Sequence, residues 1–477
     1  MISKDLNENK KKVLELFNNS SDIVIHTFET LCNTQVMVCY INGFIDKEAL
    51  NDNILRPLVE NLVSPMDISD TVYITAISEV KNYDEITTGI IDGHVAVFHE
   101  ELDMAFIMNL CDYATRSVTI SDSEQVIRGP KEAFIEDLFI NKTLIRRKIR
   151  NENLVFEDLV FGDQTNTQVS LVYIKGIANE DILAELKSRL KEIKTDAILE
   201  SNYIEEYIDD APNSLVPTVY NTEKPDVLAG KILEGRIGIM IDGSPNALTV
   251  PKIFIECLMA AEDYYLHPIY ATYLRVIRLI SLFISTTLVG LYIAFSNFHQ
   301  EMIPTQLLIS IAGQRQGVPL TNFLEALLMI MFFEIMKEAG LRLPKAIGQT
   351  VTLIGGLVIG QAAVDAGLVS AIMVIIVSAT GITEFVNPTL RDLIVITRLV
   401  LLVLGATLGI YGIACGMIAM LFYLVSIKSF GVPYLYPYGP YDKEAMKDSI
   451  LTSHVYKFNY RPKYISNEKS RKRNRRA

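Results

Sequence analysis

Polar and small side chains recur at helical spacing within one apolar stretch of the sequence. A helix would place on a single face the residues Gln349, Thr352, Gly356, Gly360 and Ala363, because they are three or four positions apart. Such a face either lets helices pack closely or lines a narrow hydrated path for ions. The residue types alone leave both interpretations open.

Two carboxylates lie near the ends of predicted membrane helices. Asp365 directly follows the polar stripe, and Glu384 lies near the end of the next apolar stretch. Acidic groups at the mouth of a channel raise the local concentration of cations. The alternative is that both carboxylates are simply hydrated at a membrane interface.

Further charged residues flank or interrupt the apolar stretches. Glu325 and Glu334 are too costly to face lipid, so we expect them at an interface or inside an assembly. Arg275 and Arg278 directly precede an apolar run and are expected at the membrane interface. Arg398 opens another apolar run, and we expect its side chain to reach the lipid headgroups.

A second stripe consists of glycine alone and is assigned to helix packing. It comprises Gly405, Gly409, Gly412 and Gly416, with almost no polar neighbours.

The sequence contains no recognisable catalytic pattern. It has no phosphate-binding glycine loop, no nucleophile elbow and no paired zinc histidines. His94 and His99 are the nearest pair of histidines, and we interpret them as strand residues rather than metal ligands. The five cysteines are scattered and never form C-x-x-C. We therefore expect no enzymatic activity, no metal and no cofactor.

Four apolar segments are long enough to cross the roughly 30 Å hydrocarbon core of a bilayer. They are residues 279–296, 347–364, 368–387 and 399–427. The last is long for one span and either tilts or breaks into two helices, so four to six crossings are allowed. Residues 320–340 are also apolar, but their glutamates favour an interfacial or re-entrant helix.

Charge separates the chain into two halves. Residues 1–270 contain 24 Lys or Arg and 45 Asp or Glu, whereas residues 271–477 contain 20 and 11. Basic residues near membrane helices favour the cytoplasmic side. Those before the first span and in the C-terminal tail therefore predict that both ends of a multi-pass protein lie in the cytoplasm. That arrangement requires an even number of spans.

Two segments of the acidic half resemble each other. QVMVCYINGF (35–44) and QVSLVYIKGI (168–177) each read as an apolar strand that ends near a glycine and leads into an amphipathic helix. GIIDGHVAVF (89–98) and GIMIDGSPNALTV (238–250) each place Asp-Gly between apolar runs, which predicts a β-hairpin. We therefore predict two related α/β subdomains.

The predicted fold class is an α/β soluble half of two related subdomains, followed by an all-α transmembrane bundle of about four helices. The predicted boundaries are a tail (1–20), subdomain 1 (21–125), a basic helical connector (126–150), subdomain 2 with a pre-membrane linker (151–270), the transmembrane region (271–430) and a cytoplasmic basic tail (431–477). The connector's basic end would contact anionic lipid or a neighbouring subunit, or form a solvated helix face. It comprises Lys142, Arg146, Arg147, Lys148 and Arg150.

Several motifs closely resemble the A subunit of the bacterial spore germinant receptors, the GerA family. The resemblance covers residues from about 20 to 440 and is most specific in the run 298–385. Flanking motifs agree: RGPKEAF (128–134), GRIGIMIDGSPNALTVP (235–251), EDYYLHPIYATYLRVIR (262–278) and SFGVPYLYP (429–437).

The resemblance implies a nutrient-sensing receptor in the inner membrane of the spore. It implies a permease-like B subunit and a lipoprotein C subunit as partners, contact with membrane lipids and no nucleic acid. The A subunit would form a homo-oligomer and release monovalent cations along the face that carries Gln349, Thr352 and Gly356. Two alternatives remain, a nutrient-binding transporter and a non-conducting scaffold.

Overall fold

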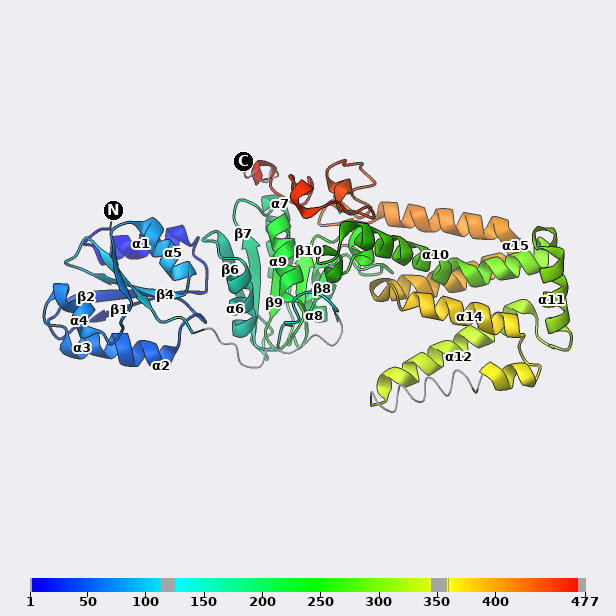
Figure 1. The fold of residues 1–477 in the computed structure, drawn as a ribbon, viewed down its shortest axis with the longest axis horizontal. Helices are drawn as coiled ribbons and strands as arrows, with labels where there is room; N and C mark the ends of the chain where they lie inside the picture. The colour runs from blue at the N-terminus through cyan, green and yellow to red at the C-terminus, as the bar shows by residue number, and fades with distance from the viewer. Residues whose placement is uncertain (1, 113–123, 125, 345–357, 359, 471–477) are drawn as a thin grey trace.

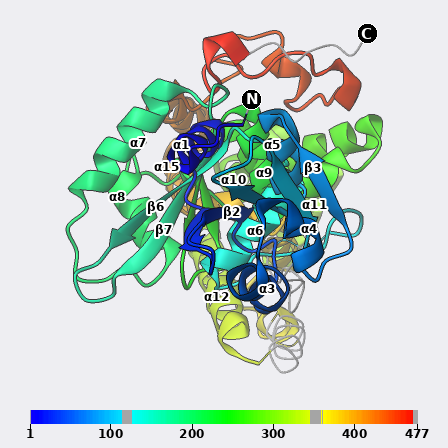
Figure 2. The same ribbon diagram turned by 90° about the vertical axis from the view of Figure 1, so that its left-hand side faces the viewer.

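The computed structural model describes residues 2–112, 124, 126–344, 358 and 360–470. Three parts follow one another along the long axis: a first sheet domain at the N-terminal end, a second sheet domain in the middle, and a helical part (Figure 1). Figure 2 looks along this axis, with the first domain in front and the helices α10 and α15 behind. After the helices, the chain returns to the second sheet domain.

The first domain is built on a five-stranded sheet with the order β1-β2-β4-β5-β3. All of its neighbouring strands are antiparallel. Its elements are α1 (Leu6–Leu16), β1 (Ile23–Glu29), β2 (Gln35–Ile41), α2 (Lys47–Leu50), α3 (Arg56–Asn61), α4 (Ile68–Thr71), β3 (Ile77–Val80), α5 (Tyr83–Ile91), β4 (His94–His99) and β5 (Ala105–Asn109).

The second domain has a sheet of the same size, the order β6-β7-β9-β10-β8, and again only antiparallel pairs. Counted from each domain's first strand, the two orders are identical. The two resembling segments form β2 and β7, which hold the same place in their sheets. The elements are α6 (Leu138–Lys148), β6 (Leu154–Phe161), β7 (Thr167–Ile174), α7 (Glu180–Glu192), α8 (Ser201–Ile208), β8 (Tyr220–Thr222), α9 (Pro225–Glu234), β9 (Ile237–Ile241) and β10 (Ala247–Val250).

Alternating side chains explain why helices cover both faces of the second sheet. In β7, Leu171 packs in the core shared with α7 and α8, whereas the next residue, Val172, packs in the core shared with α6 and α9. Ile239 and Met240 of β9 divide in the same way. A strand that is buried on both faces needs apolar residues throughout, which is why these strands read as continuous apolar runs.

The two Asp-Gly pairs have different roles. Asp242-Gly243 joins β9 to β10, as the predicted hairpin requires. Asp92-Gly93 instead joins the end of α5 to β4, so the hairpin predicted there is wrong. Gly93 has a φ of 89°, which a helix end before a strand also favours, and the dipeptide alone does not distinguish the two contexts.

Ser244 and Asn246 in the same motif anchor the start of α8. Both side chains donate hydrogen bonds to the Glu200 carboxylate, at 2.6 and 3.2 Å, and the backbone N–H of Asn202 donates a third. Burial acts in the opposite direction, but these donors lower the pKa of Glu200 to about 2. The carboxylate therefore ties the β9–β10 turn to a helix N-terminus, where negative charge is favoured.

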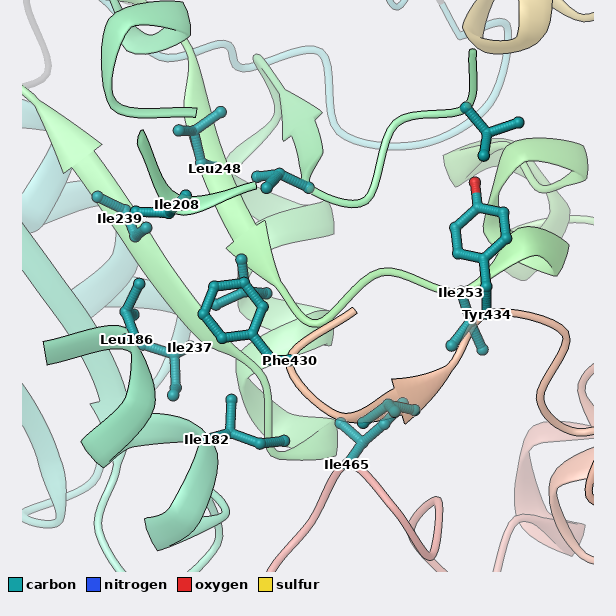
Figure 3. Packing of buried hydrophobic residues seen from close by; sticks show 14 of the residues in the cluster. Ile182, Leu186, Ile208, Ile237, Ile239, Leu248, Ile253, Phe430, Tyr434 and Ile465 are labelled. Carbon is teal, nitrogen blue, oxygen red and sulfur yellow. The ribbon is translucent and has the colours of Figure 1, made fainter. Parts of the chain in front are cut away.

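The described residues of both predicted tails are parts of folded domains. In α1, Val13 is fully buried in the first-domain core, so residues 2–20 are not a free tail. Residues 428–470 return to the second domain through β11 (Lys428–Ser429) and β12 (Val432–Pro433). Phe430, Tyr434 and Ile465 belong to the buried core that also contains residues of α7, β9 and β10; Figure 3 shows this core, with Tyr434 beside Ile253.

The helical part contains α10 (Pro268–Phe298), α11 (Thr305–Arg315), α12 (Asn322–Arg342), α14 (Ala371–Glu384) and α15 (Arg391–Ser426). In the described ranges, two helical stretches are long and apolar enough to cross a membrane, Pro268–Phe298 and Pro388–Ser426. They contain the first and fourth predicted spans. The third prediction, 368–387, becomes the shorter apolar helix α14, and most of the second, 347–364, lies outside the described residues.

Helix α15 reverses direction at Gly409. This residue has φ 61° and ψ −147°, a conformation that glycine adopts far more readily than other residues. A Cβ atom on Gly412 would lie 2.5 Å from the carbonyl oxygen of Leu404, eight residues earlier, and one on Gly416 would lie 2.6 Å from Leu401. A straight helix separates such residues by about 12 Å or more. The long fourth stretch is therefore a helical hairpin.

The connector's basic end lies at the junction of the two sheet domains. Arg146 is only 1% exposed, and it donates to both carboxylate oxygens of Asp22 at 2.8 Å and to the carbonyl oxygens of Asn151 and Leu154. Asp22 directly precedes β1, so this pair fastens the first domain to the second. Arg146 is therefore not part of a solvated helix face, and its buried side chain is not open to anionic lipid or to a neighbouring subunit.

Three other members of the basic end also have partners within the chain. Lys142 pairs with Asp158, Lys148 with Glu132, and Arg150 with Asp92.

Replacing Arg146 tests this junction. Arg146→Met keeps most of the volume but leaves the Asp22 carboxylate buried without its cation, so we expect a loss of about 3–5 kcal/mol in unfolding free energy. Arg150→Met is the control, because the Arg150–Asp92 pair is about half exposed; we expect a loss of at most about 1 kcal/mol. Unfolding of the detergent-solubilised full chain measures both. Equal losses would contradict the assignment, and a double variant with Asp22→Leu should recover most of the stability.

Candidate functional site

A buried ion cluster lies where the second sheet domain meets α10. Arg275 is fully buried; its Nε is 3.0 Å from Asp263 Oδ2 and its Nη1 is 2.9 Å from Asp448 Oδ1. One turn further along α10, Arg278 donates to both oxygens of Asp263 at 2.7 and 2.9 Å. Tyr264 donates to the other oxygen of Asp448 at 2.8 Å.

The cluster fastens α10 to the linker that precedes it and to a C-terminal segment that is distant in sequence. Asp263 belongs to the linker before α10, and Asp448 to the returning C-terminal segment. We expected the two arginines at the membrane interface, but the protein itself surrounds Arg275 and provides its counter-ions. Removing either carboxylate would leave a buried guanidinium group unpaired, which is costly in a low-dielectric interior.

A second buried cluster joins α12, α14 and α15. Glu384, at the end of α14, binds Lys337 Nζ at 2.6 Å and Arg398 Nη1 at 3.0 Å. Glu334 binds the same two cations, at 2.6 and 2.7 Å. Glu384, Lys337 and Arg398 are buried, and a third, more exposed cation, Arg391, lies 3.9 Å from Glu384.

Two sequence predictions fail at this cluster. Glu384 is 2% exposed, so it is neither a hydrated interface group nor open to a channel mouth within this chain. Arg398 is 1% exposed and does not reach outward to headgroups. The reason is the same for both: a charged residue flanked by apolar sequence either snorkels or finds a partner, and the partners here come from other helices.

Glu325 connects the other ends of α12 and α14. This fully buried carboxylate accepts hydrogen bonds at 2.5 Å from the backbone N–H and the hydroxyl of Ser370, which caps α14. The first turn of α12 contacts the start of α14 through Glu325, and Lys337, near the end of α12, contacts the end of α14. The two helices therefore run parallel. Glu325 and Glu334 are thus held by partners within the chain.

The polar stripe is only partly described. Gln349, Thr352 and Gly356 lie outside the described residues. Gly360 is buried, with Val374 of α14 3.6 Å from the place a Cβ would take, and Ala363 is buried in the core that α10, α12 and α14 share. Asp365 is exposed and accepts a hydrogen bond from Gln361 at 2.9 Å.

The glycine stripe lies where helices approach closely. A Cβ on Gly405 would lie 2.7 Å from the carbonyl oxygen of Gly290 in α10, so the two backbones nearly touch. Gly412 and Gly416 face the first half of α15. At Gly409 the hairpin turn packs against His299, at the end of α10.

Sequence reasoning missed Asp263, Asp448 and Lys337 as functional candidates. Lys337 carried the clearest local signal, because it lies three residues after Glu334 on a helix and can neutralise it. Asp448 carried none, since it is 173 residues from Arg275. The first cluster joins α10 to the linker and the C-terminal segment, and the second joins α12, α14 and α15 to one another. In the described residues no group of three or more His, Cys, Asp or Glu could hold a metal ion.

The two sheet domains precede two described helical stretches that are long and apolar enough to cross a membrane, which suggests a membrane-associated protein. A family model described as Bacillus/Clostridium GerA spore germination protein matches residues 11–464. The chain belongs to this family, as its motifs predicted.

Individual relatives agree with the family model. Spore germination protein KA of Bacillus subtilis is 38% identical over 98% of this chain and 87% of its own length. Spore germination protein GerLA of Bacillus cereus is 34% identical over 98% of this chain and 96% of its own length. A solved structure is also similar, the crystal structure of the N-terminal domain of the A subunit of the Bacillus megaterium spore germinant receptor GerK3. Its sequence is 31% identical, and the match covers 53% of this chain and 97% of the GerK3 chain, with a TM-score of 0.41.

Neutralising Asp263 tests the first cluster. Asp263→Asn removes the carboxylate that pairs with both arginines of α10, and we expect a loss of about 3 kcal/mol or more in stability. Glu338→Gln is the control, because its pair with Arg342 is exposed; we expect a loss of at most about 1 kcal/mol. The melting temperature of the full chain in detergent measures both. A melting temperature for Asp263→Asn as high as that of the control would show that the cluster does not hold the junction.

Proposed function

We propose that this chain is the A subunit of a nutrient-sensing germinant receptor and that identical copies form a monovalent-cation channel in the inner spore membrane. Family membership supports the receptor role. The observation that carries the channel proposal is the first buried ion cluster, which fastens α10 to the linker and to the C-terminal segment that pack on the second sheet domain. A shift of the second domain would therefore reach α10 directly, and the second cluster holds α12, α14 and α15 to one another.

The helical part, we infer, crosses the bilayer six times. Both ends of α15 lie at the second sheet domain: Leu393 and Leu424 belong to its core, and Tyr423 accepts a hydrogen bond from the backbone N–H of Leu215. With the reversal at Gly409, α15 accounts for two crossings. Its halves, residues 391–408 and 410–426, are each about 26 Å long, close to the thickness of the hydrocarbon core.

The remaining crossings follow from the direction of the helices. α10 leads away from the sheet domain, and α15 begins beside it, where the Asn387 side chain donates to the carbonyl oxygen of Arg278 at 2.9 Å. The predicted span 347–364 lies between α12 and α14 in the sequence, mostly outside the described residues. Counting α10, α12, the predicted span 347–364, α14 and two for α15 gives six, an even number that would leave both ends of the chain on one side.

Labelling of single cysteines tests the hairpin. In a cysteine-free background, Tyr411→Cys and Ser426→Cys lie near the turn and at the sheet-domain end, and both positions are exposed. A membrane-impermeant thiol reagent should label them from opposite sides of sealed vesicles. If α15 crossed only once, position 411 would lie within the bilayer and remain unlabelled from either side.

The conducting face is tested by flux. Gly356→Leu places a bulky apolar group on the polar stripe and should abolish rubidium efflux from liposomes that contain the receptor with its B and C subunits. Ala362→Leu is the matched control, because it introduces the same leucine side chain at an exposed position of the same stretch. A receptor that assembles but never conducts favours the non-conducting scaffold, and nutrient binding by the isolated A subunit favours the transporter.

A further inference from the structure

A cavity of about 530 Å³ lies beside the first ion cluster, within the size range of small-molecule sites. Three segments form its walls: α9 of the second domain, the linker before α10, and the returning C-terminal segment. Six aromatic side chains line it, Tyr220, Tyr264, Tyr265, Tyr436, Phe458 and Tyr460. None of the sequence motifs predicted this site, because no single segment contains it.

Two of the cationic side chains in the wall are already paired. Lys231 Nζ is 2.6 Å from Glu256 Oε1, and Arg236 Nη2 is 2.5 Å from the same oxygen. Arg236 also pairs with Glu234 and donates to the carbonyl oxygen of Pro251 at 3.3 Å. Burial favours the neutral form of Glu256, but the two cations outweigh it and lower its pKa. These groups are poorly placed to attract an anionic ligand.

One carboxylate in the wall has spare bonding capacity. The Asp226 side chain is 8% exposed, and its Oδ2 accepts a hydrogen bond from Tyr265 at 2.6 Å. Its Oδ1 is buried and has no hydrogen-bond partner in the described part of the chain. The nearest cation is Lys224, whose Nζ forms an ion pair with this Oδ1 at 3.5 Å. The hydrogen bond that Lys224 donates goes to the carbonyl oxygen of Pro130, at 2.6 Å.

The charge and composition of the wall select a ligand class. Among the described lining residues there are five carboxylates and three cationic side chains. Three of these carboxylates also pair with a cation behind the wall: Asp226 with Lys224, Glu444 with Lys447 and Asp448 with Arg275. Aromatic faces attract cations and pack well against flat apolar groups. A buried carboxylate oxygen without a donor is costly, and an N–H donor would satisfy it.

We propose that this cavity binds a small protonated amine with an aromatic or other apolar body, whose N–H donates to Asp226 Oδ1. Asp448 and Tyr264 also line the cavity and hold Arg275, so an occupant would touch the wall that anchors α10. The binding proposal does not depend on ion conduction.

The test compares probes of one shape and different charge on the full chain in detergent. Phenethylammonium should bind saturably, with a Kd at least about tenfold lower than that of neutral phenethyl alcohol, because its charged N–H meets a carboxylate. Phenylacetate, the corresponding anion, should bind most weakly. Titration calorimetry measures all three. Equal affinities for amine and alcohol, or no saturable amine binding, would overturn the proposal.

Two variants locate the site. Asp226→Asn keeps an acceptor for Tyr265 but removes the charge, and it should abolish the preference for the amine. Glu444→Gln, at a more exposed position of the same wall, should preserve it. If Asp226→Asn does not fold, hydrogen exchange of the wild-type chain replaces it: phenethylammonium should slow exchange in residues 226–234 and 455–462 more than the alcohol does. An unchanged preference in Asp226→Asn, or no such slowing, would contradict the site.

Discussion

The buried charge of Arg275 imposes the strongest constraint on how this chain folds. A guanidinium group with no exposed surface needs counter-charges inside the protein, and Asp263 and Asp448 provide them from two different segments. The linker, α10 and the C-terminal segment must therefore come together for any of them to be stable there. This requirement explains why the chain returns from the helices to the second sheet domain instead of ending in a free tail.

The two sheet domains share a strand order but differ in what they contact. The first is joined to the second through Arg146 and Asp22, and its core is made only of its own residues. The second shares a core with both ends of α15 and with Tyr434 and Ile465 of the returning segment. We interpret the shared order as a duplication in which the second copy became the attachment point for the helices.

The helices pack through two different kinds of contact, close approach at glycines and buried ion pairs. α10 and α15 approach through glycine, so backbone touches backbone at Gly290 and Gly405. α12, α14 and α15 are held by charged groups at defined positions, with Glu384 contacting cations from two other helices. Glycine contacts fix separation and permit sliding, whereas buried ion pairs fix register. A conformational change in this region must therefore break or exchange specific ion pairs.

The sequence by itself determined those features that depend on neighbours within a few residues. Apolar runs predicted β2 and β7, the apolar run 279–296 predicted a helix long and apolar enough to cross a membrane, found as α10, and the motifs of residues 298–385 predicted the family that the comparisons confirm. Even the break in the fourth span was one of two predicted outcomes, because 29 apolar residues exceed one crossing. Only the tertiary structure decided where that break falls, which turn Asp92-Gly93 makes, and that Glu384 and Arg398 are buried. The burial of Glu384 and Arg398 depends on partners from another helix, 47 and 64 residues away, and Arg275 meets Asp448 across 173 residues. The pattern of local side chains contains no information about which distant charge will enter the same low-dielectric space.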